Sequence, residues 1–184
     1  SFGISLHNAL NIFYKEVSEN NAPSLADFKK ILKKNWISDG YVNKKHEQER
    51  FLQAINILEK FYETECNSPI KPLGIELPFS FTLKNGVKIF GKIDRVDKKG
   101  EGIEIIDYKT GEDNPKADKA HKLQLKIYAL AATRVKDNIL NQVPENIALT
   151  LHFLEGNSKK TMTFKKDELD ILEDQLIEKI AEIE

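Results

Sequence analysis

Cysteine is almost missing from this chain, with Cys66 the single example among 184 residues. One cysteine cannot form a disulfide within the chain, which is typical of a reducing compartment, and we expect a cytoplasmic protein. One cysteine also cannot supply the thiolates that hold an iron–sulfur cluster. We therefore expect neither disulfides nor an iron–sulfur cluster in the fold.

Long apolar runs and an excess of one charge are missing as well. No stretch is apolar over the length that spans a membrane, and no secretory signal is present. Basic and acidic residues number 28 and 29, so the net charge is −1, whereas a dedicated nucleic-acid-binding chain is expected to be basic. Any nucleic-acid binding therefore depends on local lysine pairs, which are more often ordinary solvated helix faces: Lys29–Lys30, Lys33–Lys34 and Lys44–Lys45.

Helical and extended patterns of apolar residues follow one another along the chain. They predict helices at about 4–19, 24–34 and 41–65, around 124–128, and from 167 onward. They predict strands at 75–83, 87–97 and 103–109, joined by glycine-containing turns into a meander, and later strands at 148–154 and 160–164. The predicted fold class is therefore α/β, in α+β layers, with a mixed central sheet that contains the three-strand meander and is flanked by helices.

Two neighbouring strands of the meander carry acidic residues. Strand alternation places Asp107 and Lys109 on one face, at the end of an otherwise apolar run. A hairpin that is symmetric about its turn pairs Ile103 with Lys98 and sets Asp94 opposite Asp107. Facing carboxylates repel each other, and a divalent cation between them reverses the sign of that interaction. The alternative is a pair of ordinary polar strand ends, since a lone Asp-x-Lys is common by chance.

Two carboxylates and a lysine suit one kind of chemistry. Mg²⁺ is usually held by one or two carboxylates together with water and substrate phosphates. A lysine beside it stabilises charge on a phosphate, or helps to orient and deprotonate the attacking water. The combination of Asp94, Asp107 and Lys109 therefore indicates metal-assisted hydrolysis of a phosphodiester.

The helix around residues 124–128 adds two polar side chains. Gln124 and Tyr128 lie four residues apart, so they share one face of the helix. Leu123, Ile127 and Leu130 form a neighbouring apolar stripe that we expect to pack on the sheet. A glutamine at the edge of such a stripe is as often structural as functional.

Histidines give a weaker signal. His7 lies on an amphipathic helix beside Leu6 and Leu10, where a lone histidine is more often a partly buried core residue than a ligand. The other histidines match no pattern, and we interpret them as surface or structural residues: His46, His121 and His152.

Three segments together resemble the PD-(D/E)XK nuclease superfamily: Gly91–Asp94, Ile106–Gly111 and Gln124–Tyr128. Within it the chain looks like the RecB-like branch, and in particular like the nuclease domain at the C-terminus of UvrD/PcrA-type superfamily 1 helicases. Ile93 replaces the superfamily's signature proline, as is usual in that branch. The resemblance implies a restriction-endonuclease-like fold in a single domain over residues 1–184. Because the chain starts at Ser1 without Met, we interpret it as a fragment of a larger helicase–nuclease.

The resemblance also implies roles for the acidic residues and the lysine. Asp94 and Asp107 would be catalytic ligands of a divalent metal, and Lys109 the catalytic lysine. Glu76 is a looser match to an acidic residue that often precedes the hairpin, and is a further candidate ligand.

Three more residues match motifs of the family. His7 matches the histidine on the family's first helix, which contributes to the metal site. Because histidine is a softer ligand than carboxylate, we expect Mn²⁺ to serve as well as Mg²⁺. Gln124 and Tyr128 match a Gln-x-x-x-Tyr motif that lies beside the active site and helps to place substrate.

The leading hypothesis is a metal-dependent deoxyribonuclease, and an exonuclease in particular, acting on single-stranded DNA ends. By resemblance, superfamily 1 helicase domains of the parent protein would deliver the strand during DNA repair or recombination. The alternative is a nuclease-like fold that no longer cleaves and serves as a DNA-binding or protein-docking module. The complete set of motif residues favours the enzyme.

Overall fold

The computed structural model describes residues 1–182, which fall into two compact units. The first unit comprises Ser1–Ile75, Tyr108–Asp113 and His152–Lys159. The second comprises Glu76–Asp107, Asn114–Leu151 and Lys160–Glu184. Each unit is described below by itself.

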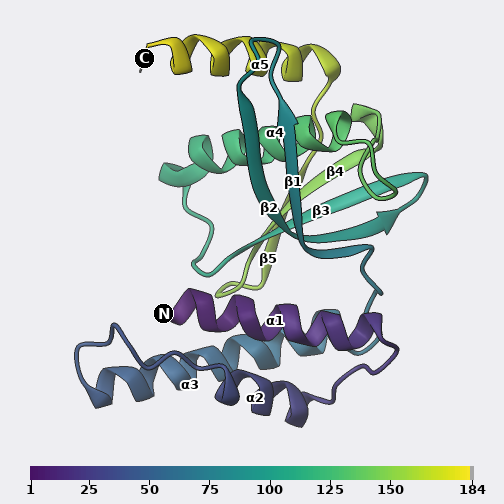
Figure 1. The fold of residues 1–184 in the computed structure, drawn as a ribbon. Coiled ribbons are helices and arrows are strands. Elements are labelled where there is room, and N and C mark those ends of the chain that lie inside the picture. Colours follow the sequence, from purple (N-terminus) through teal and green to yellow (C-terminus); the bar gives the residue numbers. More distant parts are fainter. Residues whose placement is uncertain (183–184) are drawn as a thin grey trace. The chain divides into compact units, whose positions relative to one another are not determined.

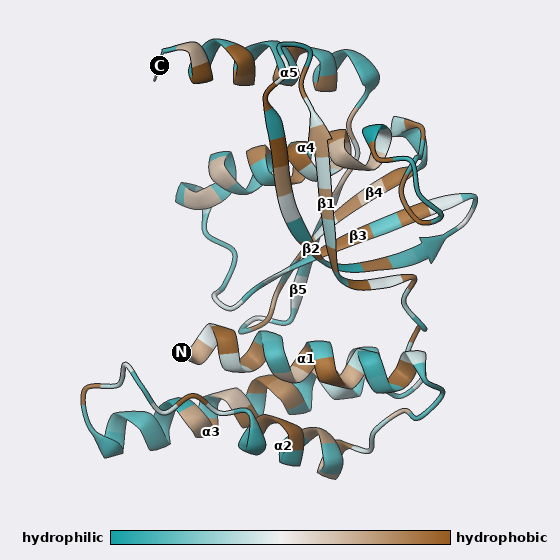
Figure 2. Ribbon diagram, viewed as in Figure 1, coloured by the Kyte–Doolittle hydropathy of each residue, from teal (hydrophilic) through white to brown (hydrophobic). Residues whose placement is uncertain are grey.

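Three helices that contact one another form most of the first unit, as Figure 1 shows. They are α1 (Phe2–Ser18), α2 (Leu25–Lys34) and α3 (Lys44–Phe61), and α3 continues as the π-helical turn η1 (Tyr62–Cys66). Apolar and polar residues alternate along α1 (Figure 2), the pattern of a helix that is buried on one side. Aromatic rings meet in the core, where the centroids of Phe13 and Phe28 are 4.6 Å apart.

Side-chain caps set the starts of α2 and α3. Ser24 Oγ accepts a hydrogen bond from the backbone N–H of Asp27 at 3.1 Å, and Asn43 Oδ1 accepts one from His46 at 2.9 Å. A capping residue has extended backbone, so α3 begins at Lys44 rather than at residue 41, where the sequence pattern placed its start.

Five strands form one mixed sheet in the order β1-β2-β3-β4-β5. The strands are β1 (Gly74–Thr82), β2 (Lys88–Lys99), β3 (Gly102–Lys109), β4 (Ile147–Phe153) and β5 (Ser158–Met162). The predicted meander is confirmed in β1, β2 and β3, and the two later strands agree with prediction to within two residues. The α/β fold class and the restriction-endonuclease-like architecture are thus confirmed.

The turn between β2 and β3 fixes the register of the strands that carry the acidic residues. Gly100 has a φ of +54°, which a two-residue hairpin turn needs at its first position and which glycine adopts without a steric cost. The antiparallel register pairs Lys98 with Ile103 and Arg95 with Ile106. The pairing predicted from the symmetry of the turn is therefore confirmed.

Hydrogen bonds connect the tip of the β1–β2 hairpin to the helices of the second unit. These helices are α4 (Asp118–Arg134), preceded by the 3₁₀ turn η2 (Pro115–Ala117), and α5 (Lys166–Ala181). The buried carboxylate of Glu173 on α5 accepts hydrogen bonds from the backbone N–H of Lys84 at 3.0 Å and from the guanidinium of Arg134 at 2.5 Å. A second 3₁₀ turn, η3 (Pro144–Asn146), leads into β4.

The buried face of α4 differs from the predicted stripe. Leu125, Ala129 and Ala132 are fully buried, whereas Leu123 is 37% exposed and Ile127 is half-buried. The prediction was right for Leu130 and wrong for Leu123, because the helix turns Tyr128 inward and the buried face rotates with it.

Candidate active site

Asp107 is the centre of the candidate site. It lies two residues before the end of β3 and is only 3% exposed. The register pairs Arg95 with Ile106, and one further step in the same register sets Asp94 opposite Asp107. The two predicted metal-ligating carboxylates therefore belong to neighbouring positions on adjacent strands.

Two side chains of α4 donate to the same oxygen of Asp107. Gln124 Nε2 lies 3.1 Å from Asp107 Oδ1, and Tyr128 Oη lies 3.2 Å from it. Gln124 Nε2 also donates to Tyr128 Oη at 2.8 Å, which its two N–H groups allow. The Gln-x-x-x-Tyr pair thus lies directly on the carboxylate and fixes its orientation.

The phenol of Tyr128 is held in its neutral, donating form. Burial, and next the negative charge of Asp107, raise the pKa of Tyr128 above its ordinary value of 10.0. Its ring is 7% exposed and packs edge-to-face on Phe79, with centroids 5.9 Å apart. Tyr128 is therefore a hydrogen-bond donor to Asp107 at neutral pH.

Gly91 makes room for the ring that supports Tyr128. A Cβ on Gly91 would stand 2.6 Å from the ring of Phe79, closer than such atoms approach. Sequence reasoning quoted Gly91 only as part of a motif and did not identify Phe79. The one signal available was a glycine inside a strand pattern, which often marks a close approach.

Glu76 and Lys92 form an ion pair near Asp94. The Glu76 carboxylate lies 2.5 Å from Lys92 Nζ, and Lys92 shares a face of β2 with Asp94 because the two are two residues apart. The hydrogen bond to Glu76 and its charge raise the pKa of Lys92, and the charge of Asp94 adds to that shift. Glu76 as a metal ligand stays a prediction, and Lys92 was not identified from sequence.

A buried ion pair stiffens β2 next to Asp94. Arg95 Nε donates to Asp97 Oδ1 at 2.7 Å, and the two residues are 4% and 2% exposed. Their positions away from Asp94 agree with strand alternation, but their burial was not predicted, since charged strand residues are usually exposed.

His7 and Lys109 belong to the first unit. The imidazole of His7 packs edge-to-face on Tyr108 with centroids 6.0 Å apart. Lys109 is the last residue of β3, on the same face of that strand as Asp107, and its carbonyl accepts a hydrogen bond from Leu154 at 2.8 Å. The roles of His7 as a ligand and of Lys109 in catalysis stay predictions.

The remaining histidines, His46, His121 and His152, were expected to be surface or structural residues. His152 is buried, stacks on Phe61 with centroids 5.2 Å apart and bonds Asn157 at 2.9 Å. His46 Nδ1 accepts a hydrogen bond from Val42 at 3.3 Å, and His121 is half-buried on α4. The contacts of His46 and His152 are those of structural residues.

The donor set at Asp107 suits a hard cation. Mg²⁺ needs only one or two carboxylates if water and phosphate complete its shell, and Asp94 and Asp107 can supply these. Within residues 1–182 there is no group of three or more His, Cys, Asp or Glu side chains arranged to hold a metal by itself.

Comparison with known proteins identifies the family. The model of the PD-(D/E)XK nuclease superfamily matches residues 1–184, and the chain belongs to that superfamily. Its members use divalent metals, typically Mg²⁺, and the membership indicates a metal-dependent nuclease that binds DNA.

Other comparisons add little. A solved structure titled "Crystal structure of SSO0001" is similar at 16% identity with a TM-score of 0.42, over 98% of this chain and 74% of that chain. None of the curated proteins matches. Among residues 1–182, no helix combines the length and apolar character needed to cross a membrane.

Proposed function

We propose that this chain is a deoxyribonuclease that uses Mg²⁺ or Mn²⁺, with Asp94 and Asp107 as its metal ligands. The observation that carries the proposal is the convergence of Gln124 and Tyr128 on one oxygen of a buried aspartate. A purely structural aspartate gains nothing from a neighbouring strand that sets a second carboxylate opposite it. A bound cation gives that arrangement a physical reason.

Each residue has a distinct part in the proposed reaction. A divalent metal held by Asp94 and Asp107 would supply hydroxide near neutral pH and neutralise charge on the scissile phosphate. Lys109 stabilises that charge or orients the attacking water. Gln124 and Tyr128 are positioning residues, because they hold one oxygen of Asp107 in place. His7 is a further ligand and Glu76 a candidate one.

We further assign the chain to the RecB-like branch, as a single nuclease domain over residues 1–184 of a larger cytoplasmic helicase–nuclease. Superfamily 1 helicase domains of the parent protein deliver single-stranded ends to an exonuclease site during repair or recombination. The motif order of Gly91–Asp94, Ile106–Gly111 and Gln124–Tyr128 supports this branch. A domain without an iron–sulfur cluster is consistent with the single Cys66.

The test is cleavage of end-labelled single- and double-stranded DNA in EDTA, Mg²⁺ and Mn²⁺. Metal-dependent cleavage should be lost in Asp107→Ala and Lys109→Ala. Two exposed residues outside the site provide matched controls, Asp167→Ala and Lys136→Ala, which should cleave like the unaltered protein.

Other results would change the proposal. Absence of cleavage by folded protein with either metal would favour the inactive DNA-binding or protein-docking module, unless added helicase domains restore it. Cleavage that survives Asp107→Ala would move the active site elsewhere. Products of one nucleotide from a labelled end would support the exonuclease, and internal cuts in circular DNA would refute it.

A further inference from the structure

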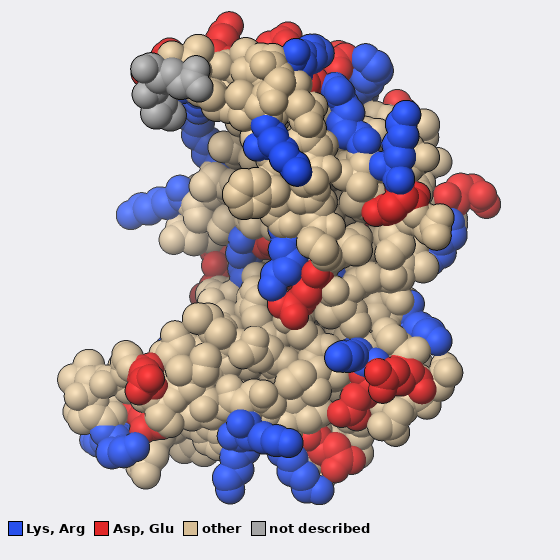
Figure 3. Space-filling model, viewed as in Figure 1, with Lys and Arg blue, Asp and Glu red and all other residues tan. Residues whose placement is uncertain are grey.

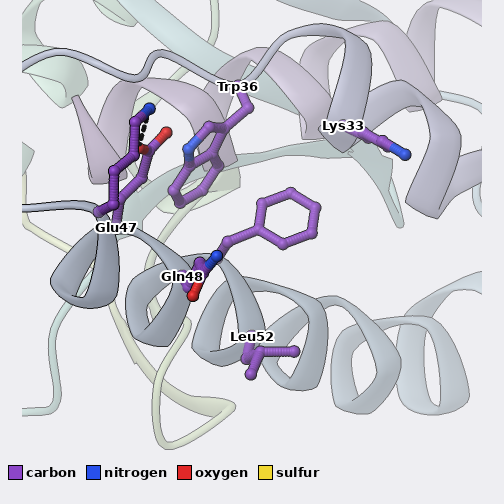
Figure 4. A pocket seen from close by; sticks show the side chains of 7 residues that line it. Lys33, Trp36, Glu47, Gln48 and Leu52 are labelled. Atoms are coloured by element: carbon purple, nitrogen blue, oxygen red, sulfur yellow. Dashed lines mark hydrogen bonds and ion pairs between the residues drawn. The ribbon is translucent and has the colours of Figure 1, made fainter.

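A groove lies in the first unit at the end of α2 and the start of α3 (Figure 4). Its volume is about 570 Å³, in the range of pockets that hold small ligands. Trp36, Phe51 and Leu52 give it an apolar lining, and Lys33 projects from the end of α2 beside it. The groove has no part in the proposed catalytic site.

The aromatic rings at the groove contact one another. The ring of Trp36 is stacked on Tyr41 with an interplanar angle of 6° and meets Phe51 edge-on with centroids 5.0 Å apart. Leu52 is 63% exposed in spite of its apolar side chain. The groove therefore presents a preformed apolar surface to which a flat ligand can dock without first ordering the side chains.

Positive charge surrounds this surface. Residues 24–52 contain seven lysines and arginines against four acidic residues, although the whole chain carries a net charge of −1. Figure 3 shows basic side chains gathered over α2. The acidic residue in the groove lining, Glu47, is ion-paired with Lys44 at 3.0 Å.

Two lysines at the groove remain available for a ligand. Lys33 lines the groove and Lys45 is the neighbour of the lining residue Lys44 on α3. Both are exposed, and neither forms an ion pair within the described part of the chain, whereas Lys34 lines a different hollow together with Glu16 and Asp27. By contrast, Lys29 and Lys30 pair with Glu59 and Asp27. An apolar aromatic surface next to unpaired cations is the combination that binds single-stranded nucleic acids, where bases stack and phosphates meet lysines.

We propose that this groove binds single-stranded DNA, with bases against Trp36, Phe51 and Leu52 and phosphates against Lys33 and Lys45. The assignment rests on the proposed nuclease function, which supplies the polymer. Single-stranded rather than duplex DNA is the occupant because duplex bases are already stacked and cannot reach an aromatic lining. None of the residues that line the groove is among those assigned to cleavage.

The single tryptophan of the chain makes the test direct, because all tryptophan fluorescence comes from Trp36. An oligo-dT strand is titrated into the protein in EDTA, so that binding is measured without cleavage. We expect saturable quenching of fluorescence, with an affinity that falls as salt rises. Lys33→Gln and Lys45→Gln combined should reduce the slope of log affinity against log salt by about 1.4.

Matched variants separate the groove from general electrostatics. Lys98→Gln and Lys136→Gln combined remove the same charge from exposed positions in the second unit and should leave affinity and quenching unchanged. Leu52→Gln should weaken binding about tenfold or more, while Ile171→Gln, at an apolar side chain of similar exposure, should not.

Several results would overturn the proposal. Equal losses in the two lysine double variants would show nonspecific attraction, and equal quenching by duplex DNA would exclude single-strand recognition. Absence of quenching in a protein that still cleaves DNA with metal would reject the groove and leave the nuclease intact. Fluorescence that depends on protein concentration and not on DNA would assign the groove to a second copy of the chain.

Discussion

Tyr128 Oη lies 3.2 Å from Oδ1 of Asp107, so a phenol on α4 and a carboxylate at the end of β3 are joined by a hydrogen bond. Gln124, one turn earlier on α4, donates to the same oxygen. A buried carboxylate is costly unless it is hydrogen-bonded or paired, and these two donors satisfy that requirement on one side. They thereby hold Asp107 in a single orientation.

Tyr128→Phe removes one of these donors while keeping the ring. We expect kcat for DNA cleavage to fall about tenfold, the equivalent of one hydrogen bond to a charged group, and the free energy of unfolding to fall by about 1–3 kcal/mol because a buried carboxylate loses a donor. Steady-state rates with metal in excess provide the measurement. Tyr62→Phe, which removes a hydroxyl that donates to Pro23 O at 3.2 Å in the first unit, is the control and should cleave normally.

The raised pKa of Tyr128 predicts a loss of stability in alkali. The folded protein retains a proton that the unfolded chain releases above pH 10, since burial first and the charge of Asp107 next raise the pKa of Tyr128. The free energy of unfolding should therefore be unaffected by this group below pH 10 and should fall as pH rises beyond it. Urea unfolding from pH 8 to pH 11.5 measures the slope, and an equal slope in Tyr128→Phe would contradict the prediction.

Gly91→Ala should displace the ring of Phe79, which packs on Tyr128, although Gly91 itself is not one of the proposed site residues. The new Cβ would stand 2.6 Å from the ring of Phe79, which packs on Tyr128, so the ring has to move. Overpacking of this kind costs about 1–3 kcal/mol, and cleavage should slow as well. Denaturant midpoints test the stability, and Gly156→Ala, whose Cβ meets only Ser158 Oγ at 3.6 Å, should be neutral.

A double-mutant cycle should show that Arg95 and Asp97 are coupled in their contribution to the free energy of unfolding. Arg95→Met leaves a carboxylate buried without its cation, and should lower the free energy of unfolding by about 3–5 kcal/mol. Arg95→Met combined with Asp97→Leu should recover most of that loss, because neither charge is then left buried. Additive losses measured by urea unfolding would mean that the two side chains act independently.

Much of the fold and part of the site could be predicted from sequence because they depend on local rules. Glycine turns predicted the meander and the pairing of Lys98 with Ile103, and helical periodicity placed Gln124 with Tyr128. Strand alternation alone predicted that Asp107 and Lys109 lie on the same face of β3. These relationships need only a few neighbouring residues.

The remaining features depend on tertiary context. Glu76 has a φ of +46°, which is uncommon for a residue with a side chain, and no sequence rule predicts its ion pair with Lys92 across β1 and β2. The burial of Arg95 and the ring of Phe79 beside Gly91 likewise depend on how elements pack. Charged strand residues are ordinarily expected to be exposed, and a glycine in a strand does not show which ring lies beside it. None of these three features could therefore be predicted from the sequence.

Titration of Mn²⁺ followed by electron paramagnetic resonance, in which free Mn²⁺ gives the sharp signal, tests most directly whether Asp94 and Asp107 hold a metal. It needs no DNA and no helicase. Asp94→Asn and Asp107→Asn should each weaken Mn²⁺ binding by about tenfold or more, since each removes one of the carboxylate ligands. Asp167→Asn, at an exposed position, should bind like the unaltered protein. Equal binding by all four proteins would contradict the assignment of Asp94 and Asp107 as metal ligands.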